Sequence, residues 1–277
     1  MKFISFEHDG LAGYGVLDGD IVRVASVSGP ADLKAAIAAG VLGDIANAST
    51  RELRLADVTL LPVIPNPRKI LCVGHNYEDH RVETGRAKVA HPSIFTRWPD
   101  TLVGAGAPIV RPRESTDLDY EGELALVIGR GGRRIPVETA ADHIAGFSLF
   151  NDASVRDWQW HTHQFTPGKN FPGTGAFGPW LMTPDEMGPL AEQRITTRLN
   201  DQVVQDAGFD QMIFPVAEIV AYCSGFTMLS PGDVIVTGTP GGVGAKRTPP
   251  LWMKPGDVVT VEITGLGVLR NPIAEDH

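Results

Sequence analysis

Apolar residues are interspersed with polar residues over short stretches at the start of the chain. Residues 2–7 are predicted to form a strand, and the Asp-Gly pair in residues 17–20 suits the positive φ angles of a type I′ hairpin turn. A short helix is predicted next, between Asp32, which can cap its first turn, and Gly40, which ends it. The N-terminal segment is therefore expected to combine a small sheet with one helix.

Short apolar runs typical of strands dominate the rest of the chain. They lie at residues 70–73, 123–128, 144–150, 195–199, 234–237 and 258–263. Prolines cluster in residues 62–67, just before the first run, so we expect a small N-terminal α+β domain at residues 1–66 and a larger domain at residues 67–277. Helical periodicity is clearest in residues 214–223. Because the runs do not alternate with helices of about 10 to 15 residues, the sequence favours a mainly β or α+β fold over a doubly wound sheet or a β/α barrel.

Composition favours small molecules and proteins as partners. The 277 residues carry 24 Lys and Arg against 33 Asp and Glu, a net charge of −9, whereas nucleic acids and anionic membranes are normally met by a basic surface. No stretch approaches the roughly 18 apolar residues of a membrane span or the apolar core of a signal peptide, so we expect a cytoplasmic protein. Cys72 and Cys223 both lie in apolar runs, as buried free thiols do.

Three carboxylates are the first candidates for chemistry. Glu121 and Glu123 lie two residues apart, so a strand would place both on one face, where two like charges need a proton or a cation between them. Asp152 follows the apolar run at residues 144–150 and is a third candidate. Hard carboxylate oxygens select Mg²⁺, Mn²⁺ or Ca²⁺ over zinc. On spacing alone, the solvated face of an amphipathic strand explains the two glutamates better than a metal site does.

The motifs around these carboxylates change that balance. In chain order they are GHNYEDH at residues 74–80, DYEGELALVIG at 119–129, NDASVRDWQ at 151–159, GKNF at 168–171 and TGTPGGVG at 237–244. On these motifs the chain resembles the fumarylacetoacetate hydrolase family, which includes acylpyruvate and fumarylpyruvate hydrolases and 2-hydroxyhepta-2,4-diene-1,7-dioate isomerases. The first 65 residues carry no such motif.

The resemblance carries expectations about the fold, the cofactor and the assembly. It implies a mixed β-sandwich roll with a small N-terminal domain, which agrees with the many short strands. It implies that Glu121, Glu123 and Asp152 hold a divalent cation, with Mg²⁺ or Mn²⁺ as the main candidates and Ca²⁺ as a third. It also implies a homodimer.

A histidine and a glutamate form a candidate proton-transfer pair. His80 and Glu83 lie three residues apart, a spacing that brings both side chains to one face of a helical turn. An exposed charged turn is the alternative without chemistry. In the family that the chain resembles, the matching residues lie in a lid and activate water, which implies this role for both and a lid at residues 78–91. The resemblance also implies that Lys169 stabilises a developing oxyanion.

Four further residues match positions that bind substrate in this family. They are Arg156, Gln159, Thr239 and Arg97. The resemblance places Arg156 and Gln159 near the substrate or metal and makes Thr239 a ligand of a substrate carboxylate. Arg97 stands where many members have lysine, and it keeps the charge in a different geometry. Without the motifs, surface salt bridges and a turn hydroxyl would explain all four.

Other positions depart from the family pattern or suggest rival sites. His75 stands where many members have arginine, and Phe209 is expected to reshape the pocket around the distal part of the substrate. His161 and His163 have the spacing of a transition-metal pair on a strand, but no third ligand lies near them in the sequence. A polar and aromatic loop that lines the site or a dimer surface explains them better.

These features together predict an enzyme that acts on a small oxo acid. The main hypothesis is hydrolytic cleavage of a carbon–carbon bond in a 2,4-dioxo or related β-diketo acid, through an enolate that the cation stabilises. His80, oriented by Glu83, would activate the attacking water. Three alternatives use the same residues: decarboxylation of a 2-oxo diacid such as oxaloacetate, isomerisation or hydration of a 2-hydroxydienoate, and a metal-stabilised binding protein without turnover.

Overall fold

A long mixed sheet runs through the molecule. The computed structural model describes residues 1–85 and 87–276. The strand order is β4-β3-β2-β1-β14-β12-β11-β17-β6-β7, with β5 beside β1 and β8 beside β14. The strands are β1 (Lys2–His8), β2 (Leu11–Asp18), β3 (Ile21–Val24), β4 (Arg51–Arg54), β5 (Thr59–Leu60), β6 (Ile70–Gly74), β7 (Ser93–Arg97), β8 (Leu102–Val103), β11 (Gly122–Ile128), β12 (Ile144–Asp152), β14 (Gly175–Met182) and β17 (Val234–Val236).

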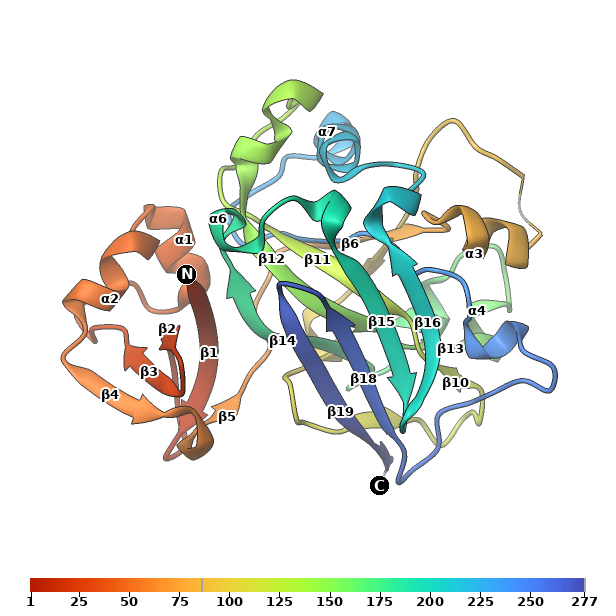
Figure 1. The fold of residues 1–277 in the computed structure, drawn as a ribbon, viewed down its shortest axis with the longest axis horizontal. Coiled ribbons are helices and arrows are strands. Elements are labelled where there is room, and N and C mark those ends of the chain that lie inside the picture. The colour runs from red at the N-terminus through yellow and green to blue at the C-terminus, as the bar shows by residue number, and fades with distance from the viewer. Residues whose placement is uncertain (86, 277) are drawn as a thin grey trace.

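A second sheet packs against the first and makes the molecule a sandwich (Figure 1). Its order is β16-β15-β18-β19-β9, and β10 and β13 form a separate pair. The bounds are β9 (Ile109–Arg111), β10 (Leu118–Asp119), β13 (Ser154–Val155), β15 (Arg194–Leu199), β16 (Gln202–Gly208), β18 (Val258–Ile263) and β19 (Gly267–Glu275). Leu124 and Leu149 of the first sheet share a buried core with Ile195, Val261 and Leu269 of the second. The predicted mixed β-sandwich with many short strands is confirmed.

The helices are short and lie around the sheets. The α-helices are α1 (Leu33–Ala39), α2 (Ile45–Ala48), α3 (Glu78–Glu83), α4 (Arg156–Gln159), α5 (Thr166–Lys169), α6 (Pro184–Met187) and α7 (Val216–Phe226). The 3-10 helices are η1 (Leu42–Asp44), η2 (Leu55–Asp57), η3 (Pro99–Thr101), η4 (Val137–His143), η5 (Leu190–Glu192), η6 (Phe209–Gln211) and η7 (Gly244–Lys246). In the described part of the chain, no helix has the length and apolar character needed to cross a bilayer.

The N-terminal segment extends the main sheet. Strand β1 pairs antiparallel with β14 through Lys2 opposite Met182 and Phe3 opposite Leu181. Strands β1 to β4, with α1 and α2, form the left side of Figure 1. Side chains of α1 share a core cluster with Leu181, so packing as well as strand pairing joins this segment to the rest. A domain boundary after residue 66 stays a prediction.

The predicted N-terminal elements are present, with one error in a turn. Helix α1 begins after Asp32, whose carboxylate accepts a hydrogen bond from an N–H of the first turn, and it ends at Gly40 with φ 69°. Strands β2 and β3 form the predicted hairpin, but Gly19 has the only positive φ angle among the residues of that turn, so the type I′ assignment is wrong. The Asp-Gly pair with both φ angles positive is instead Asp9 (53°) and Gly10 (74°), between β1 and β2.

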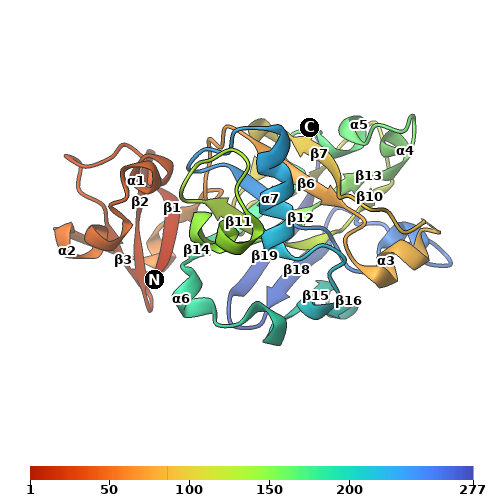
Figure 2. The same ribbon diagram turned by 90° about the horizontal axis from the view of Figure 1, so that it is seen from above.

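Helix α7 covers the part of the main sheet formed by β6, β11 and β17 (Figure 2). Ile219, Val220 and Cys223 pack on Leu71 of β6 and Leu126 of β11, as the helical periodicity of this segment predicts. Both cysteines of the chain are free and buried, as expected. Burial raises the pKa of Cys223 to about 12, so this thiol is inert at neutral pH.

Neighbouring strands bring the motifs of distant segments together. Strands β11 and β12 pair antiparallel with Glu123 opposite Phe150, so the start of one strand lies beside the end of the other. The N–H of Asp152 donates to the carbonyl of Glu121 at 2.9 Å, which places both residues at the same end of the paired strands. Strand β6 leads into α3 at this end of the sheet through His75, whose φ is 56°.

Candidate active site

The three predicted carboxylates meet in the interior. Glu121 is 5% exposed, Glu123 2% and Asp152 0%, so the alternative of a solvated strand face is wrong. One ligand atom from each lies within 4.8 Å of the other two, and within residues 1–85 and 87–276 this is the only such group of His, Cys, Asp or Glu. Converging carboxylate oxygens are the donor set that hard divalent cations prefer.

Buried cations hold two of the three carboxylates. Lys169 Nζ lies 2.6 Å from Glu121 Oε2 and 2.7 Å from Asp152 Oδ2. Arg97 Nη1 lies 2.5 Å from the other oxygen of Asp152. Arg156 Nη2 lies 2.7 Å from the other oxygen of Glu121. Burial acts to raise the pKa of Glu121. The positive charges of Lys169 and Arg156 outweigh this effect and hold that pKa at about 2.

Glu123 is different, because it has no ion pair within the described residues. It accepts one hydrogen bond, from the N–H of Gly238 at 2.5 Å. Burial first, and then the neighbouring charges of Asp152 and Glu121, raise the pKa of Glu123 well above its usual range. A divalent cation fits this donor set, because it would supply the positive charge that Glu123 lacks at the point where the three side chains meet.

The predicted proton-transfer pair faces this cluster from α3. His80 is only 4% exposed, so the exposed-turn alternative is wrong. Its Nδ1 lies 3.2 Å from Glu83 Oε2, and Glu83 in turn accepts the N–H of Gly242 at 3.1 Å. The imidazole stacks on the ring of His75 with 5.2 Å between centroids. With Nδ1 engaged by Glu83, Nε2 is the nitrogen that remains for chemistry in the cavity.

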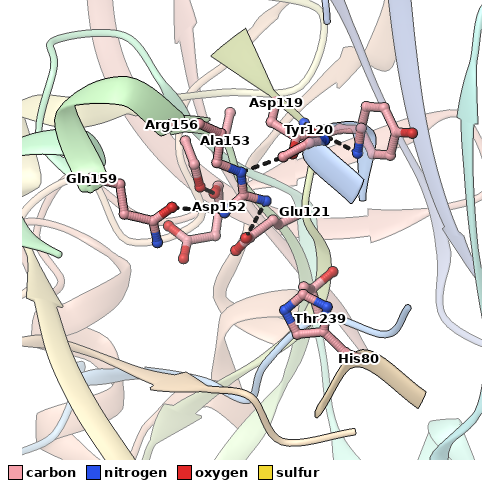
Figure 3. A network of polar contacts seen from close by, with 12 residues as sticks. His80, Asp119, Tyr120, Glu121, Asp152, Ala153, Arg156, Gln159 and Thr239 are labelled. Atoms are coloured by element: carbon pink, nitrogen blue, oxygen red, sulfur yellow. Dashed lines mark hydrogen bonds and ion pairs between the residues drawn. The ribbon is translucent and has the colours of Figure 1, made fainter. Parts of the chain in front are cut away.

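Arg156 is held by a residue to which the sequence pattern assigned no role. Asp119, fully buried, accepts hydrogen bonds from Arg156 Nε at 2.8 Å, from the N–H of Gly244 at 2.8 Å and from the N–H of Ala245 at 3.0 Å. Figure 3 shows Arg156 between Asp119 and Glu121. The signal that was missed is the period of two, because Asp119 stands two residues before Glu121 just as Glu121 stands two before Glu123.

A cavity opens over the carboxylates. The polar and charged residues of its wall include His75, His80, Glu121, Glu123, Arg156, Gln159, Lys169, Thr239 and Lys246. Thr239 Oγ1 donates to the carbonyl of Gly122 at 3.0 Å and accepts from Gln205 Nε2 at 2.8 Å. Gln159 Oε1 accepts from Arg156 Nη1 at 2.8 Å. The structure thus brings three of the four predicted substrate-binding residues to one cavity.

Four residues lie away from the cavity. Arg97 is buried behind Asp152, where it also donates to the carbonyl of Ala153 and to Thr174 Oγ1. It supports the carboxylate of Asp152, and its predicted contact with substrate stays a prediction. Phe209 is part of the core between the sheets. His161 and His163 are exposed on a loop after α4 and belong to no ligand cluster of the described chain. The predicted lid, residues 78–91, contains Arg86, which lies outside the described residues.

Replacing Arg97 by alanine should lower the free energy of unfolding by about 3–5 kcal/mol, because Asp152 would stay buried with one cationic partner removed. Urea unfolding followed by circular dichroism measures the change. The matched control is Arg194→Ala, whose ion pair with Asp206 is half-exposed and should contribute less than about 1 kcal/mol. Equal losses in the two variants would contradict a supporting role of Arg97.

Comparisons with known proteins agree with this geometry. Residues 69–274 match the family model "Fumarylacetoacetate (FAA) hydrolase C-terminal". The chain is 41% identical over 223 residues to mitochondrial oxaloacetate tautomerase fahd2 of Xenopus laevis, a match that covers 80% of this chain and 70% of the relative. It is 40% identical over 224 residues to oxaloacetate tautomerase YisK of Bacillus subtilis, covering 79% and 74% of the two chains.

A solved structure gives the same answer for the fold. Fumarylacetoacetate hydrolase from the psychrophilic bacterium Exiguobacterium antarcticum superposes with a TM-score of 0.88 at 36% identity, with 100% of both chains covered. The sequence match covers the segment that carries the carboxylates, the buried cations and the histidine described above. The chain therefore belongs to the fumarylacetoacetate hydrolase family.

Proposed function

We propose that this protein is a divalent-cation-dependent enzyme that interconverts the keto and enol forms of a short 2-oxo acid, with oxaloacetate as the first candidate. The observation that carries the proposal is the placement of one buried imidazole, His80, against the carboxylate cluster and Lys169. Keto-enol exchange needs one group that moves a proton at carbon and positive charge beside the oxygen, and this site contains both.

The residues divide the reaction between them. His80 Nε2 takes a proton from carbon 3 of the substrate, and the electron pair of that C–H bond becomes the second bond between carbons 2 and 3. The carbonyl π pair moves onto oxygen, beside the ammonium of Lys169, and the oxygen then takes up a proton from water. The hydroxide formed in this way accepts the proton held by His80, which restores the free imidazole. Glu83, bonded to Nδ1, keeps the imidazole oriented and stabilises its protonated form. The reverse sequence returns the keto form.

The cation is proposed to be Mg²⁺ or Mn²⁺, held by Glu121, Glu123 and Asp152, with Ca²⁺ as a third candidate. When bound, it would lower the free energy of negative charge on the substrate oxygens. The homodimer and the cytoplasmic location stay predictions; the frog relative is named as mitochondrial, and the other curated relative is bacterial.

Hydrolytic cleavage, the main hypothesis from the sequence, would use the same groups. In that reaction His80 would take a proton from an attacking water molecule instead of from carbon 3 of the substrate. Enol chemistry is the better supported proposal, because both curated relatives described above are named as oxaloacetate tautomerases at 41% and 40% identity. No residue of the mechanism above is needed for only one of the two reactions.

The test is the loss of the ultraviolet absorbance of enol-oxaloacetate, with the spontaneous rate subtracted. The purified protein with Mg²⁺ or Mn²⁺ should accelerate ketonisation, and a chelator should abolish the acceleration. Parallel assays follow carbon dioxide release from oxaloacetate and cleavage of an acylpyruvate. Cleavage of the acylpyruvate without any effect on ketonisation would overturn the proposal in favour of the hydrolase, and activity that survives chelation would remove the cation from the mechanism.

A further inference from the structure

One cation in the cavity wall has no carboxylate partner in the described part of the chain. Three lysine and arginine side chains line the cavity: Lys169, Arg156 and Lys246. The first two pair with Glu121 and its neighbours. Lys246 forms no ion pair with any described residue, and its Nζ lies over the ring of Trp160, 6.0 Å from the centroid. Its positive charge is therefore available to a ligand.

Hydrogen bonds to Asp119 fix the backbone of the segment that carries Lys246. Lys246 ends η7, whose first two N–H groups, those of Gly244 and Ala245, both donate to buried Asp119. The next side chain, Arg247, turns the other way and donates to the carbonyl of Val204 at 2.6 Å. Of this adjacent basic pair, only Lys246 contributes to the cavity wall.

The segment that carries Trp160 is connected to the same aspartate. Trp160 follows α4, and its N–H donates to the carbonyl of Arg156 at 3.1 Å. Arg156 Nε donates to Asp119 at 2.8 Å, as Figure 3 shows. Asp119 thus anchors both the segment that carries Lys246 and the segment that carries Trp160. A lysine held against an aromatic face in this way loses less side-chain entropy when it binds an anion.

We propose that Lys246, beside Trp160, binds the distal carboxylate of the substrate and thereby selects 2-oxo dicarboxylic acids over 2-oxo monocarboxylic acids. The inference rests on the proposed function and adds a residue that binds the end of the substrate distal to the 2-oxo group. A 2-oxo diacid has one carboxylate for the end of the cavity with Lys169 and a second that needs another positive group. The net charge of −9 repels a dianion, so an uncompensated cation beside the cavity also favours its approach.

The first experiment compares Lys246→Gln with wild type on two substrates. Ketonisation of enol-oxaloacetate reports the diacid, and deuterium exchange at carbon 3 of pyruvate, followed by NMR, reports the monoacid. We expect kcat/KM for oxaloacetate to fall about tenfold, mainly through KM, because Lys246 is exposed and solvent screens its ion pair with the substrate. Exchange of pyruvate, which has no distal carboxylate, should stay unchanged. Lys246→Arg should retain most of the preference. The matched control Lys254→Gln removes an exposed lysine that is absent from the cavity wall and should change neither substrate.

The second experiment measures binding without turnover. Calorimetry with Mg²⁺ present compares N-oxalylglycine, which carries a distal carboxylate, with oxamate, which does not. The wild type should prefer N-oxalylglycine, and Lys246→Gln should lose about tenfold in affinity for it alone. No preference in the wild type, or equal losses for both ligands, overturns the inference. If the wild type exchanges neither substrate, the proposed function fails, whereas a selective loss of N-oxalylglycine binding still supports the role of Lys246.

Discussion

Asp152→Asn should raise the dissociation constant for Mg²⁺ or Mn²⁺ by about a hundredfold and lower turnover by roughly a thousandfold. The amide keeps the size of the side chain but removes one of three negative charges that converge within 4.8 Å. Lys169 and Arg97 would then face a neutral group and add repulsion against a bound cation. Titration calorimetry measures the affinity, and enol-oxaloacetate ketonisation measures the turnover.

A stability effect must be separated from this loss. Asp142→Asn makes the same chemical change at an exposed position, and it should leave cation affinity and turnover unchanged. Thermal unfolding of both variants, with and without Mg²⁺, tells whether Asp152→Asn is folded and whether the cation still stabilises it. Wild-type cation affinity in a folded Asp152→Asn variant would exclude Asp152 from the metal site.

His80→Ala should lower ketonisation by about 10²- to 10⁴-fold, the usual contribution of a general base. Cation affinity should stay close to that of the wild type, because His80 contributes no atom to the carboxylate cluster. Added imidazole should restore part of the activity by filling the space left by the side chain. The measurements are the rate with and without imidazole and the dissociation constant for Mn²⁺.

The control for this variant is His163→Ala, which removes an exposed imidazole from the loop after α4 and should be silent. Full activity of His80→Ala would remove the imidazole from proton transfer and leave the metal site standing. A matching loss of cation affinity would instead mean that the variant disturbs the whole cavity. The two results are distinguishable because rate and affinity are measured separately.

Local patterns in the sequence were sufficient for several of the elements but not for others, such as β14 and β19. Strand β18 occupies the residues expected for it, and α1 lies between the predicted Asp32 and Gly40. Such elements depend on period, caps and turn residues within a few positions of each other. The type I′ turn was assigned to the wrong Asp-Gly pair, because the dipeptide permits positive φ angles at both sites and the strand register decides which turn uses them.

The candidate site was accessible to sequence reasoning only in part. Family motifs favoured Glu121, Glu123 and Asp152 as a site, since spacing alone favoured a solvated strand face for the two glutamates. For His80, spacing alone left a proton-transfer pair and an exposed turn equally open. Burial decides between these alternatives, and burial depends on which segments cover the strand edge. Asp119 shows the limit most clearly, because its two anchoring partners lie 125 and 126 positions further along the chain.

The sequence by itself determined the many short strands, the capped helix, the acidic net charge and the set of motifs that points to one family. Only the tertiary structure decided that the three carboxylates are buried around a common point and that Arg97 supports Asp152 from behind. It also decided that Lys246 is the cavity cation with no carboxylate partner among the described residues. The physical reason is that periodicity fixes the direction of a side chain relative to its own strand or helix. Its solvent exposure and its charge partners come from segments that are distant in the chain and adjacent only after folding.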